Sequence, residues 1–326
     1  MDKTRIAITI LAGLGVLGLL AAGCGGDDDE AADTETGQAG QQLSGRVEAD
    51  GSSTVAPFTT LAAERFQASN PQVRVTVGVS GTGGGFERFC AGETDLSDAS
   101  RPIKEEEEAV CQEGGIDHVE FQIANDALTA VVSTENDWAD CLTVEELNKI
   151  WAPGSKVNNW SQVRDGFPDV PLKLFGPGTD SGTFDYFTDE INGEEGASRS
   201  DFTASEDDNV IVRGVAGSRG GLGYFGFSYF EQNQDTLKAL AVDDGDGCVE
   251  PGVETAQSGD YTPLSRPLFV YANTESFKES QVAAFVRFML QNAEQLAEDA
   301  LFVPLTDEQL QKARDDYNAA LERVGA

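Results

Sequence analysis

The chain has 326 residues, with 57 Asp and Glu against 22 Lys and Arg, so its formal net charge at pH 7 is −35. This acidity excludes nucleic acids and anionic membrane surfaces as electrostatic partners, because their phosphates would be repelled. It also means that any anion site must depend on N–H groups, hydroxyls and a few cations placed close to the ligand, because the field of the whole chain repels anions.

The first 23 residues have the pattern of an export signal. Charged residues at positions 2, 3 and 5 precede an apolar run at 6–22, which ends in small residues. A charged start, a short hydrophobic run and a small-residue cleavage site are typical of a secretory signal peptide, and the run is short for a permanent spanning helix. We therefore predict that residues 1–23 are a cleaved signal peptide.

Cys24 follows Ala21-Ala22-Gly23, an arrangement that resembles the lipobox of bacterial lipoproteins, in which the cysteine is acylated and becomes the mature N-terminus. Leu20 lies one place further from Cys24 than in the usual pattern, and a plain signal peptide with an unmodified cysteine is the alternative. Residues 24–44 are rich in Gly, Asp, Glu, Gln, Ala and Thr and predict an acidic, lipid-anchored linker. We expect an extracytoplasmic protein, held on the cell membrane in the periplasm or at the outer face of the envelope.

A strand, a hydroxyl-rich turn and a helix follow the linker. Residues 46–49 predict the strand, Ser53 and Thr54 lie in the turn, and Pro57 suits the first turn of a helix that continues to residue 66. A helix start carries unpaired N–H groups and the positive end of the helix dipole, so this turn is suited to an anion. An ordinary helix cap without a ligand is the alternative.

The next turn contains Ser80 and Thr82. It follows a strand predicted by alternating β-branched residues at 73–79, and its glycines at 81 and 83–85 lead into a short helix. None of the glycine runs in the chain carries the Gly-Lys-Ser/Thr of a phosphate-binding P-loop, which argues against nucleotide hydrolysis. This is a second anion-ready helix start.

Ser100 and Arg101 lie in a third turn, between a short strand and an acidic helix at 104–112. The planar guanidinium group of Arg101 suits a tetrahedral oxyanion, because it offers paired hydrogen-bond donors. A salt bridge to one of the nearby glutamates is the alternative. Beyond this helix, two apolar strands at 119–123 and 128–133 are predicted, joined by residues 124–127.

Thr143 and Glu146 form the capping box of a helix that runs to residue 151. The turn that follows the apolar run at 170–175 opens another helix, and its small polar residues again suit an anion. These residues are Asp180, Ser181, Gly182 and Thr183.

The rest of the chain continues to alternate helix and strand signals. A helix is expected at 209–216, strands at 220–227 and 268–272, and amphipathic helices at 277–292 and 306–324. Such alternation argues for an α/β protein with mixed sheets, and about 280 residues are too many for one small core. We predict two domains, the first at 45–125 plus 265–326 and the second at 126–264.

Four cysteines remain after Cys24, and an even number in an exported chain favours disulfides. Three pairings are possible, and we favour Cys90 with Cys111 and Cys141 with Cys248. A zinc site is a poor alternative, because no two cysteines are spaced as a ligand pair and His118 is the only histidine. We expect no metal and no cofactor.

Four motifs together resemble the phosphate-binding proteins (PstS family) of bacterial phosphate ABC transporters. They are Gly51-Ser52-Ser53-Thr54-Val55, Ser80-Gly81-Thr82-Gly83-Gly84, Asp95-Leu96-Ser97-Asp98-Ala99-Ser100-Arg101-Pro102-Ile103 and Asp180-Ser181-Gly182-Thr183-Phe184. The likeness runs from about Arg46 to the C-terminal helices.

The resemblance implies a type II periplasmic-binding-protein fold, a two-domain "Venus flytrap" that closes around one inorganic phosphate and presents it to a membrane ABC permease. It implies a monomer without catalytic activity. Carried over motif by motif, it implies that the phosphate contacts Ser53, Thr54, Ser80, Thr82, Ser100, Arg101, Asp180, Ser181, Gly182 and Thr183.

Two positions depart from the pattern of the family. Some members have an aspartate, which accepts the proton of hydrogen phosphate, where this chain has Ser100, and some have an arginine where it has Pro177. Arg101 is predicted to supply the cation from another wall of the site. Asp98 or Asp180 is predicted to supply the acceptor.

Two other functions are compatible with the same sequence. The site could hold sulfate or molybdate, or serve phosphate sensing without transport. A serine hydrolase is the third hypothesis, because Asp180-Ser181-Gly182 superficially resembles a nucleophile turn. Such a serine needs a general base, and His118, the only histidine, lies far away in the sequence.

Overall fold

The structure is a computed structural model that describes residues 43–179 and 181–325. The predicted signal peptide, Cys24, nearly all of the predicted linker and Asp180 lie outside the described residues. Among the helices of the described part, none is long and apolar enough to cross a membrane.

The strands of the described part fall into two sheets. They are β1 (Gly45–Gly51), β2 (Val73–Val77), β3 (Leu96–Ala99), β4 (His118–Ser133), β5 (Cys141–Thr143), β6 (Lys173–Gly176), β7 (Thr203–Ala204), β8 (Gly221–Gly226), β9 (Leu237–Ala239), β10 (Ala241–Asp243), β11 (Cys248–Val249) and β12 (Ser265–Asn273). The larger sheet has the order β2-β1-β3-β12-β4-β8-β6-β7, with β9 also paired to β4, and the smaller has the order β11-β10-β5.

The helices alternate with these strands. They are α1 (Ala56–Ser69), α2 (Gly81–Cys90), α3 (Glu105–Gly114), α4 (Val144–Trp151), α5 (Gly182–Asn192), α6 (Asp208–Ala216), α7 (Phe227–Glu231), α8 (Val253–Ser258), α9 (Ser280–Gln291), α10 (Ala293–Asp299) and α11 (Asp307–Val324), with short 3-10 helices at Trp160–Gln162 and Thr274–Lys278. The capping box predicted for α4 is confirmed, since Thr143 Oγ1 accepts from Glu146 N at 3.1 Å.

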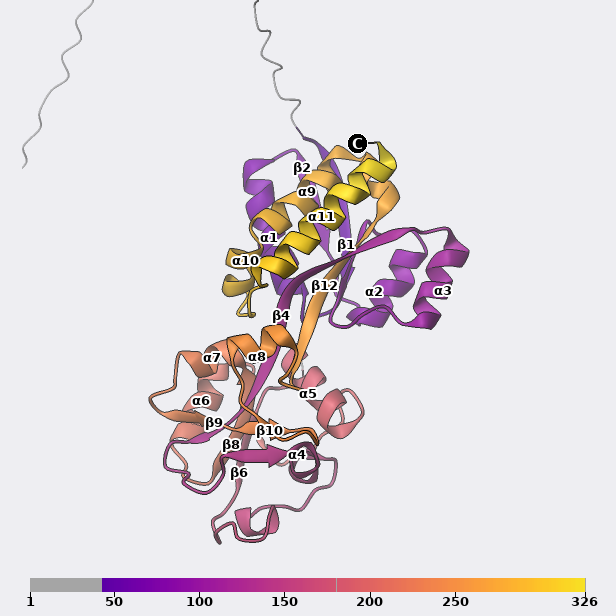
Figure 1. Ribbon diagram of the computed structural model, residues 1–326. Coiled ribbons are helices and arrows are strands. Elements are labelled where there is room, and N and C mark those ends of the chain that lie inside the picture. Colours follow the sequence, from indigo (N-terminus) through magenta and orange to yellow (C-terminus); the bar gives the residue numbers. More distant parts are fainter. Residues whose placement is uncertain (1–42, 180, 326) are drawn as a thin grey trace, which may run out of the picture. The chain divides into compact units, whose positions relative to one another are not determined.

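The α/β class with mixed sheets is confirmed. Strand β1 runs parallel to β2 and β3, whereas β12 is antiparallel to β3 and β4. In Figure 1, α1, α9, α10 and α11 lie with β1, β2 and β12, and α4 to α8 lie with β6 and β8, so two groups of elements are joined by the paired strands β4 and β12.

The prediction of two strands at 119–123 and 128–133 was wrong, because β4 is one continuous strand. Residues 118–127 of β4 pair with β12, and residues 128–133 pair with β8 and β9. The polar residues Asn125 and Asp126, which suggested a loop, are accommodated because Gln122 Nε2 donates to Asn125 Oδ1 at 2.8 Å and Arg266 faces Asp126. The predicted domain boundary at residue 126 falls inside this strand, and the boundaries stay a prediction.

The glycines at 81 and 83–85 also differ from the prediction, because they belong to α2 itself rather than to a turn before it. Glycine is a poor helix former, but Gly85 allows a close approach of α2 to β1. A Cβ on Gly85 would lie 2.5 Å from the Cα of Gly51, so no larger residue fits there. Packing against the sheet therefore outweighs helix propensity in this segment.

Each group of elements has its own hydrophobic core. The core around β1, β2 and the first part of β4 includes Phe58, Phe121 and Phe285, all of which are buried. The core around β8 includes Trp151 and Trp160, both of which are buried. Both predicted disulfides, Cys90–Cys111 and Cys141–Cys248, are confirmed.

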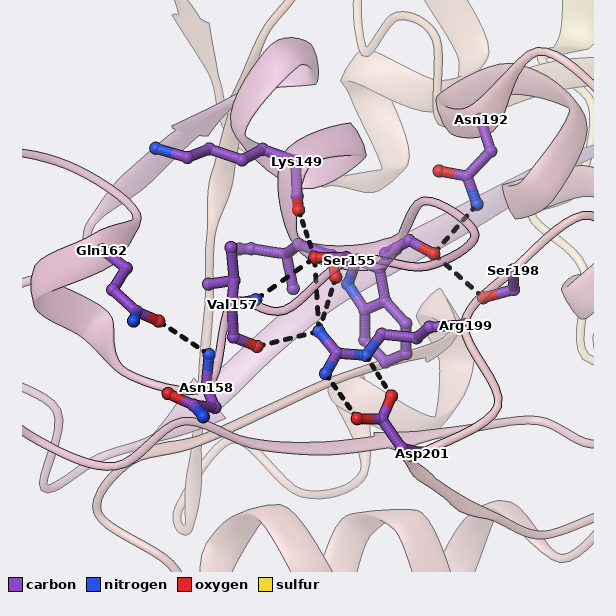
Figure 2. A network of polar contacts seen from close by, with 11 residues as sticks. Lys149, Ser155, Val157, Asn158, Gln162, Asn192, Ser198, Arg199 and Asp201 are labelled. Atoms are coloured by element: carbon purple, nitrogen blue, oxygen red, sulfur yellow. Dashed lines mark hydrogen bonds and ion pairs between the residues drawn. The ribbon is translucent and has the colours of Figure 1, made fainter.

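A buried arginine holds the loop after α4 in place (Figure 2). Arg199, which is 6% exposed, binds Asp201 with two nitrogens and donates through Nη1 to the carbonyl oxygens of Ile150 and Val157 at 2.9 and 2.8 Å. These bonds satisfy one carbonyl group in the last turn of α4 and one in the loop, and they keep the guanidinium group paired, as a buried charge requires. Arg199 therefore has a structural role.

Candidate functional site

The turn between β1 and α1 holds the first hydroxyl groups of the site. Ser52 N donates to Asp98 O at 2.9 Å, and Thr54 N donates to Ser52 Oγ at 3.2 Å. No side chain caps the start of α1. The N–H groups of Ala56, Phe58 and Thr59 donate to Ser52 O and Val55 O, and Pro57 has no N–H, so this turn offers an anion mainly the hydroxyl groups of Ser53 and Thr54.

The turn before α2 and the turn after β3 are joined through their hydroxyl groups. Thr82 Oγ1 lies 3.1 Å from Ser100 Oγ and accepts from Ser100 N at 3.2 Å. Ser80 Oγ donates to Asp50 Oδ1 at 2.6 Å, and it does not cap α2. Two segments that the sequence separates by 18 residues thus form one polar surface.

The start of α5 meets the start of α1. Ser181 caps α5, because its Oγ accepts from Thr183 N at 3.2 Å. A Cβ on Gly182 would lie 2.7 Å from Thr54 Oγ1, so only glycine allows this approach of α5 to Thr54. Two helix N-termini and a hydroxyl group therefore converge at one point, an arrangement suited to an oxyanion.

These segments line one pocket of about 670 Å³, which we call the hydroxyl pocket. Its lining residues are Ser52, Ser53, Thr54, Ser80, Gly81, Thr82, Gly83, Ser100, Arg101, Pro102, Lys104, Gly182, Asp185, Tyr186, Asp189, Glu190, Glu195, Arg266 and Pro267. Seven residues singled out from the sequence are thus brought together, namely Ser53, Thr54, Ser80, Thr82, Ser100, Arg101 and Gly182.

Other predicted site residues do not line the hydroxyl pocket or are not described by the structure. Ser181 and Thr183 adjoin the pocket through Gly182 but are not among its lining residues. Asp180 lies outside the described residues. Asp98 is fully buried, and it too is absent from the lining, so the structure does not support it as an acceptor that faces the ligand.

Arg101 lines the pocket, but its guanidinium group is engaged by α3. Its Nη1 and Nη2 donate to the two carboxylate oxygens of Glu107 at 2.8 and 2.7 Å, and Nη1 also donates to Pro102 O at 3.1 Å. Burial would raise the pKa of Glu107, but the bonds from Arg101 and from Lys104 N hold that pKa below its ordinary value. The salt bridge that was the alternative for Arg101 is therefore present.

A second arginine of the pocket, Arg266, was not predicted from the sequence. It lies in β12, opposite Asp126 of β4, with Nε 3.4 Å from Asp126 Oδ2. Its Nη2 donates to Thr54 Oγ1 at 3.0 Å, and its guanidinium carbon lies 3.6 Å from the ring centroid of Tyr186. The only signals were the scarcity of cations and the position of Arg266 just before a predicted strand.

Four carboxylates of the pocket were also missed: Asp185, Asp189, Glu190 and Glu195. Asp185 is in the first turn of α5 and half-buried. Burial raises its pKa above the ordinary value, Glu195 raises it further, and Arg266 opposes the rise. The helical spacing of 185 and 189 from Gly182 could have placed both on the face that adjoins the turn.

The described residues include no group of three or more His, Cys, Asp or Glu placed to hold a metal ion. His118 pairs with Glu108, Nε2 to Oε2 at 2.8 Å, and is not a lining residue of the hydroxyl pocket. The pocket therefore offers hydroxyl and N–H donors, two arginines, a lysine and four carboxylates. This set of groups suits a small oxyanion that can both accept and donate hydrogen bonds.

The chain is similar in sequence to known proteins over most of its length. Residues 33–293 match the family model described as the PBP superfamily domain. Protein SphX of Synechococcus elongatus is 51% identical over 262 residues, which are 79% of this chain and 77% of that protein. The phosphate-binding protein PstS of Staphylococcus saprophyticus is 41% identical over 289 residues, which are 88% of this chain and 86% of that protein.

A solved structure resembles the whole fold. It is the crystal structure of a possible phosphate-binding protein from Planctomyces limnophilus, with a TM-score of 0.83 and 50% sequence identity. The match covers 86% of this chain and 99% of that one.

Proposed function

Because this chain belongs to the PstS family of phosphate-binding proteins, within the PBP superfamily, we propose that it binds one inorganic phosphate ion in the hydroxyl pocket. The observation that carries the proposal is the convergence of Thr54, Thr82, Ser100 and Gly182 on that pocket. These residues bring hydroxyl groups and helix starts from four separate segments to one small volume. Such groups can replace the hydration shell of a tetrahedral anion.

The carboxylates of the pocket favour phosphate over sulfate. Phosphate still carries a proton at neutral pH and can donate it to a carboxylate, whereas sulfate has no proton and would be repelled. Asp185 is our candidate acceptor, because it lines the pocket one turn after Gly182. In this proposal Asp185 takes the role that was predicted from the sequence for Asp98 or Asp180.

Delivery of the phosphate to a membrane ABC permease is the second part of the proposal. It is supported by membership of a family of substrate-binding proteins. An export signal and an acylated Cys24 would place the chain as a lipid-anchored monomer outside the cytoplasm, where such a protein meets its permease. We propose no catalytic role, because the hydroxyl of Ser181 caps α5 and His118 pairs with Glu108.

Calorimetric titration of the full chain tests the proposal. We expect phosphate to bind with a dissociation constant of about 1 µM or tighter, and sulfate to bind at least about 100-fold more weakly. Thr54→Val should weaken phosphate binding, whereas Thr134→Val, an exposed threonine outside the hydroxyl pocket, should not. Equal affinities for phosphate and sulfate would contradict the choice of ligand, and turnover of esters that Ser181→Ala abolishes would contradict the absence of catalysis.

A further inference from the structure

Arg266, which lines the hydroxyl pocket, contacts residues of three other segments. It starts from β12, contacts Asp126 of β4, donates to Thr54 after β1 and stacks on Tyr186 of α5. Its side chain is 18% exposed, so it is held within the wall and still reaches the cavity. No other cation of the pocket has contacts to both α5 and the turn before α1 among the described residues.

The two arginines of the pocket differ in the donors that they have left. Arg101 uses both Nη atoms on Glu107, at 2.7 and 2.8 Å. Arg266 has one long contact with Asp126, at 3.4 Å, and one bond to Thr54, and its Nη1 has no hydrogen-bond partner in residues 43–179 and 181–325. Since a guanidinium group has five N–H donors, Arg266 keeps capacity for an oxyanion while it stays paired with Asp126.

Arg266 also lies next to the convergence of helix starts. The hydroxyl oxygen that accepts from Arg266 Nη2 is Thr54 Oγ1, the same atom that a Cβ on Gly182 would approach to 2.7 Å. An oxyanion held by the N–H groups at the start of α5 therefore comes within reach of the free edge of the guanidinium group. Asp126, which is buried, lies 3.4 Å from Nε of Arg266 through Oδ2 and so helps to orient the guanidinium group.

We propose that Arg266 is a direct anion-binding residue of the hydroxyl pocket. The inference rests on the proposed function. Because Arg266 contacts Tyr186 and Thr54 at once, the bound anion is held against both groups of elements through one side chain. Arg101 is then a secondary cation whose charge is largely taken up by Glu107.

The test is calorimetric titration of the full chain with inorganic phosphate, with thermal unfolding measured in parallel. Arg266→Gln should raise the dissociation constant between about 10-fold and about 100-fold, as expected for the loss of a charge-assisted hydrogen bond. The matched control is Arg219→Gln, because Arg219 pairs with Asp137 and stacks on Trp138 outside the pocket. It should leave the dissociation constant unchanged.

A second variant separates binding from folding. Arg266→Gln leaves Asp126 buried without its partner, and this can lower the unfolding temperature or prevent folding. The double variant Arg266→Gln with Asp126→Asn removes the ion pair without leaving a buried charge. We expect it to recover the unfolding temperature while phosphate binding stays weak.

Three results would count against the inference. If Arg266→Gln binds phosphate as the unaltered chain does, this inference is overturned and the proposed function stands. If the double variant recovers full affinity together with stability, Arg266 has only a structural role. If the unaltered chain binds no phosphate, the proposed function falls and this inference falls with it.

Discussion

Asp98, in β3, is a buried carboxyl group whose ionisation should destabilise the protein. Its Oδ1 accepts from Thr59 Oγ1 at 2.9 Å, and its Oδ2 has no hydrogen-bond partner among the described residues. Burial raises the pKa of Asp98 to about 7, while the bond from Thr59 lowers it and the nearby Asp50 raises it. The native protein therefore favours the protonated form.

The sign and size of the effect follow from the two pKa values. The ordinary value is 3.8, so the folded protein holds a proton on Asp98 that the unfolded chain has lost between about pH 4 and pH 7. The resulting stabilisation is fully present below pH 4 and is lost as the pH rises through 7. Between pH 5 and pH 7 the free energy of unfolding falls by about 1.4 kcal/mol for each pH unit, and above pH 7 this contribution changes little further. Asp98 therefore stabilises the protein by about 3 kcal/mol more at pH 5 than at pH 8.

Asp98→Asn removes this titration and keeps an oxygen that can accept from Thr59. We expect the free energy of unfolding of the variant, relative to the unaltered chain, to increase by about 3 kcal/mol from pH 5 to pH 8. Urea denaturation at both pH values measures this, and the difference between the two proteins cancels the other titrating groups. Asp137→Asn, an exposed control, should show no such change. A difference for Asp98→Asn that is independent of pH would refute the reasoning.

Two further predictions concern the pocket and the disulfides. Asp185→Asn should reduce the preference for phosphate over sulfate at least about tenfold in calorimetric titration. Asp189 is exposed and lies one turn later in α5, so Asp189→Asn is the control, and an equal loss of preference in this variant would contradict our choice of acceptor. Replacing the Cys141–Cys248 pair with serines should cost about 1.4 kcal/mol more stability in urea denaturation than replacing the Cys90–Cys111 pair, because their sequence separations are 107 and 21. A larger loss from the shorter loop would contradict the chain-entropy argument.

The hydroxyl-rich turns could be predicted because local chemistry forms them. The cap of α5 by Ser181 and the capping box of α4 depend on residues two or three places apart. Strand, turn and helix therefore follow each other in the sequence as they do in the structure. That Thr54, Thr82 and Gly182 meet in one pocket did not follow from these local patterns, and came only with the two-domain fold that the resemblance implied.

Arg266 and the continuous strand β4 could not be predicted in this way. Asp126 looks like a loop residue until its partner is known, and that partner lies 140 residues further along the chain. Likewise, nothing near Arg266 in the sequence shows that it will meet Thr54, which is 212 residues away. Both errors have one cause, the long-range ion pair between Asp126 and Arg266. It stabilises a polar segment within strand β4, and it brings Arg266 to the site although no local sequence pattern indicates this.

The charges of the pocket explain how an acidic chain can hold an anion at all. Glu107 offsets Arg101, and Asp126 offsets Arg266, so these cations attract a distant anion only weakly. Their N–H groups, however, still point in fixed directions, and the hydrogen bonds that they donate act at contact distance, where the charge of the guanidinium group strengthens them. Binding would then discriminate between anions at contact, by shape and by whether a proton is available for Asp185, rather than by long-range attraction. A site of this kind needs no positive surface, and it is compatible with a formal net charge of −35.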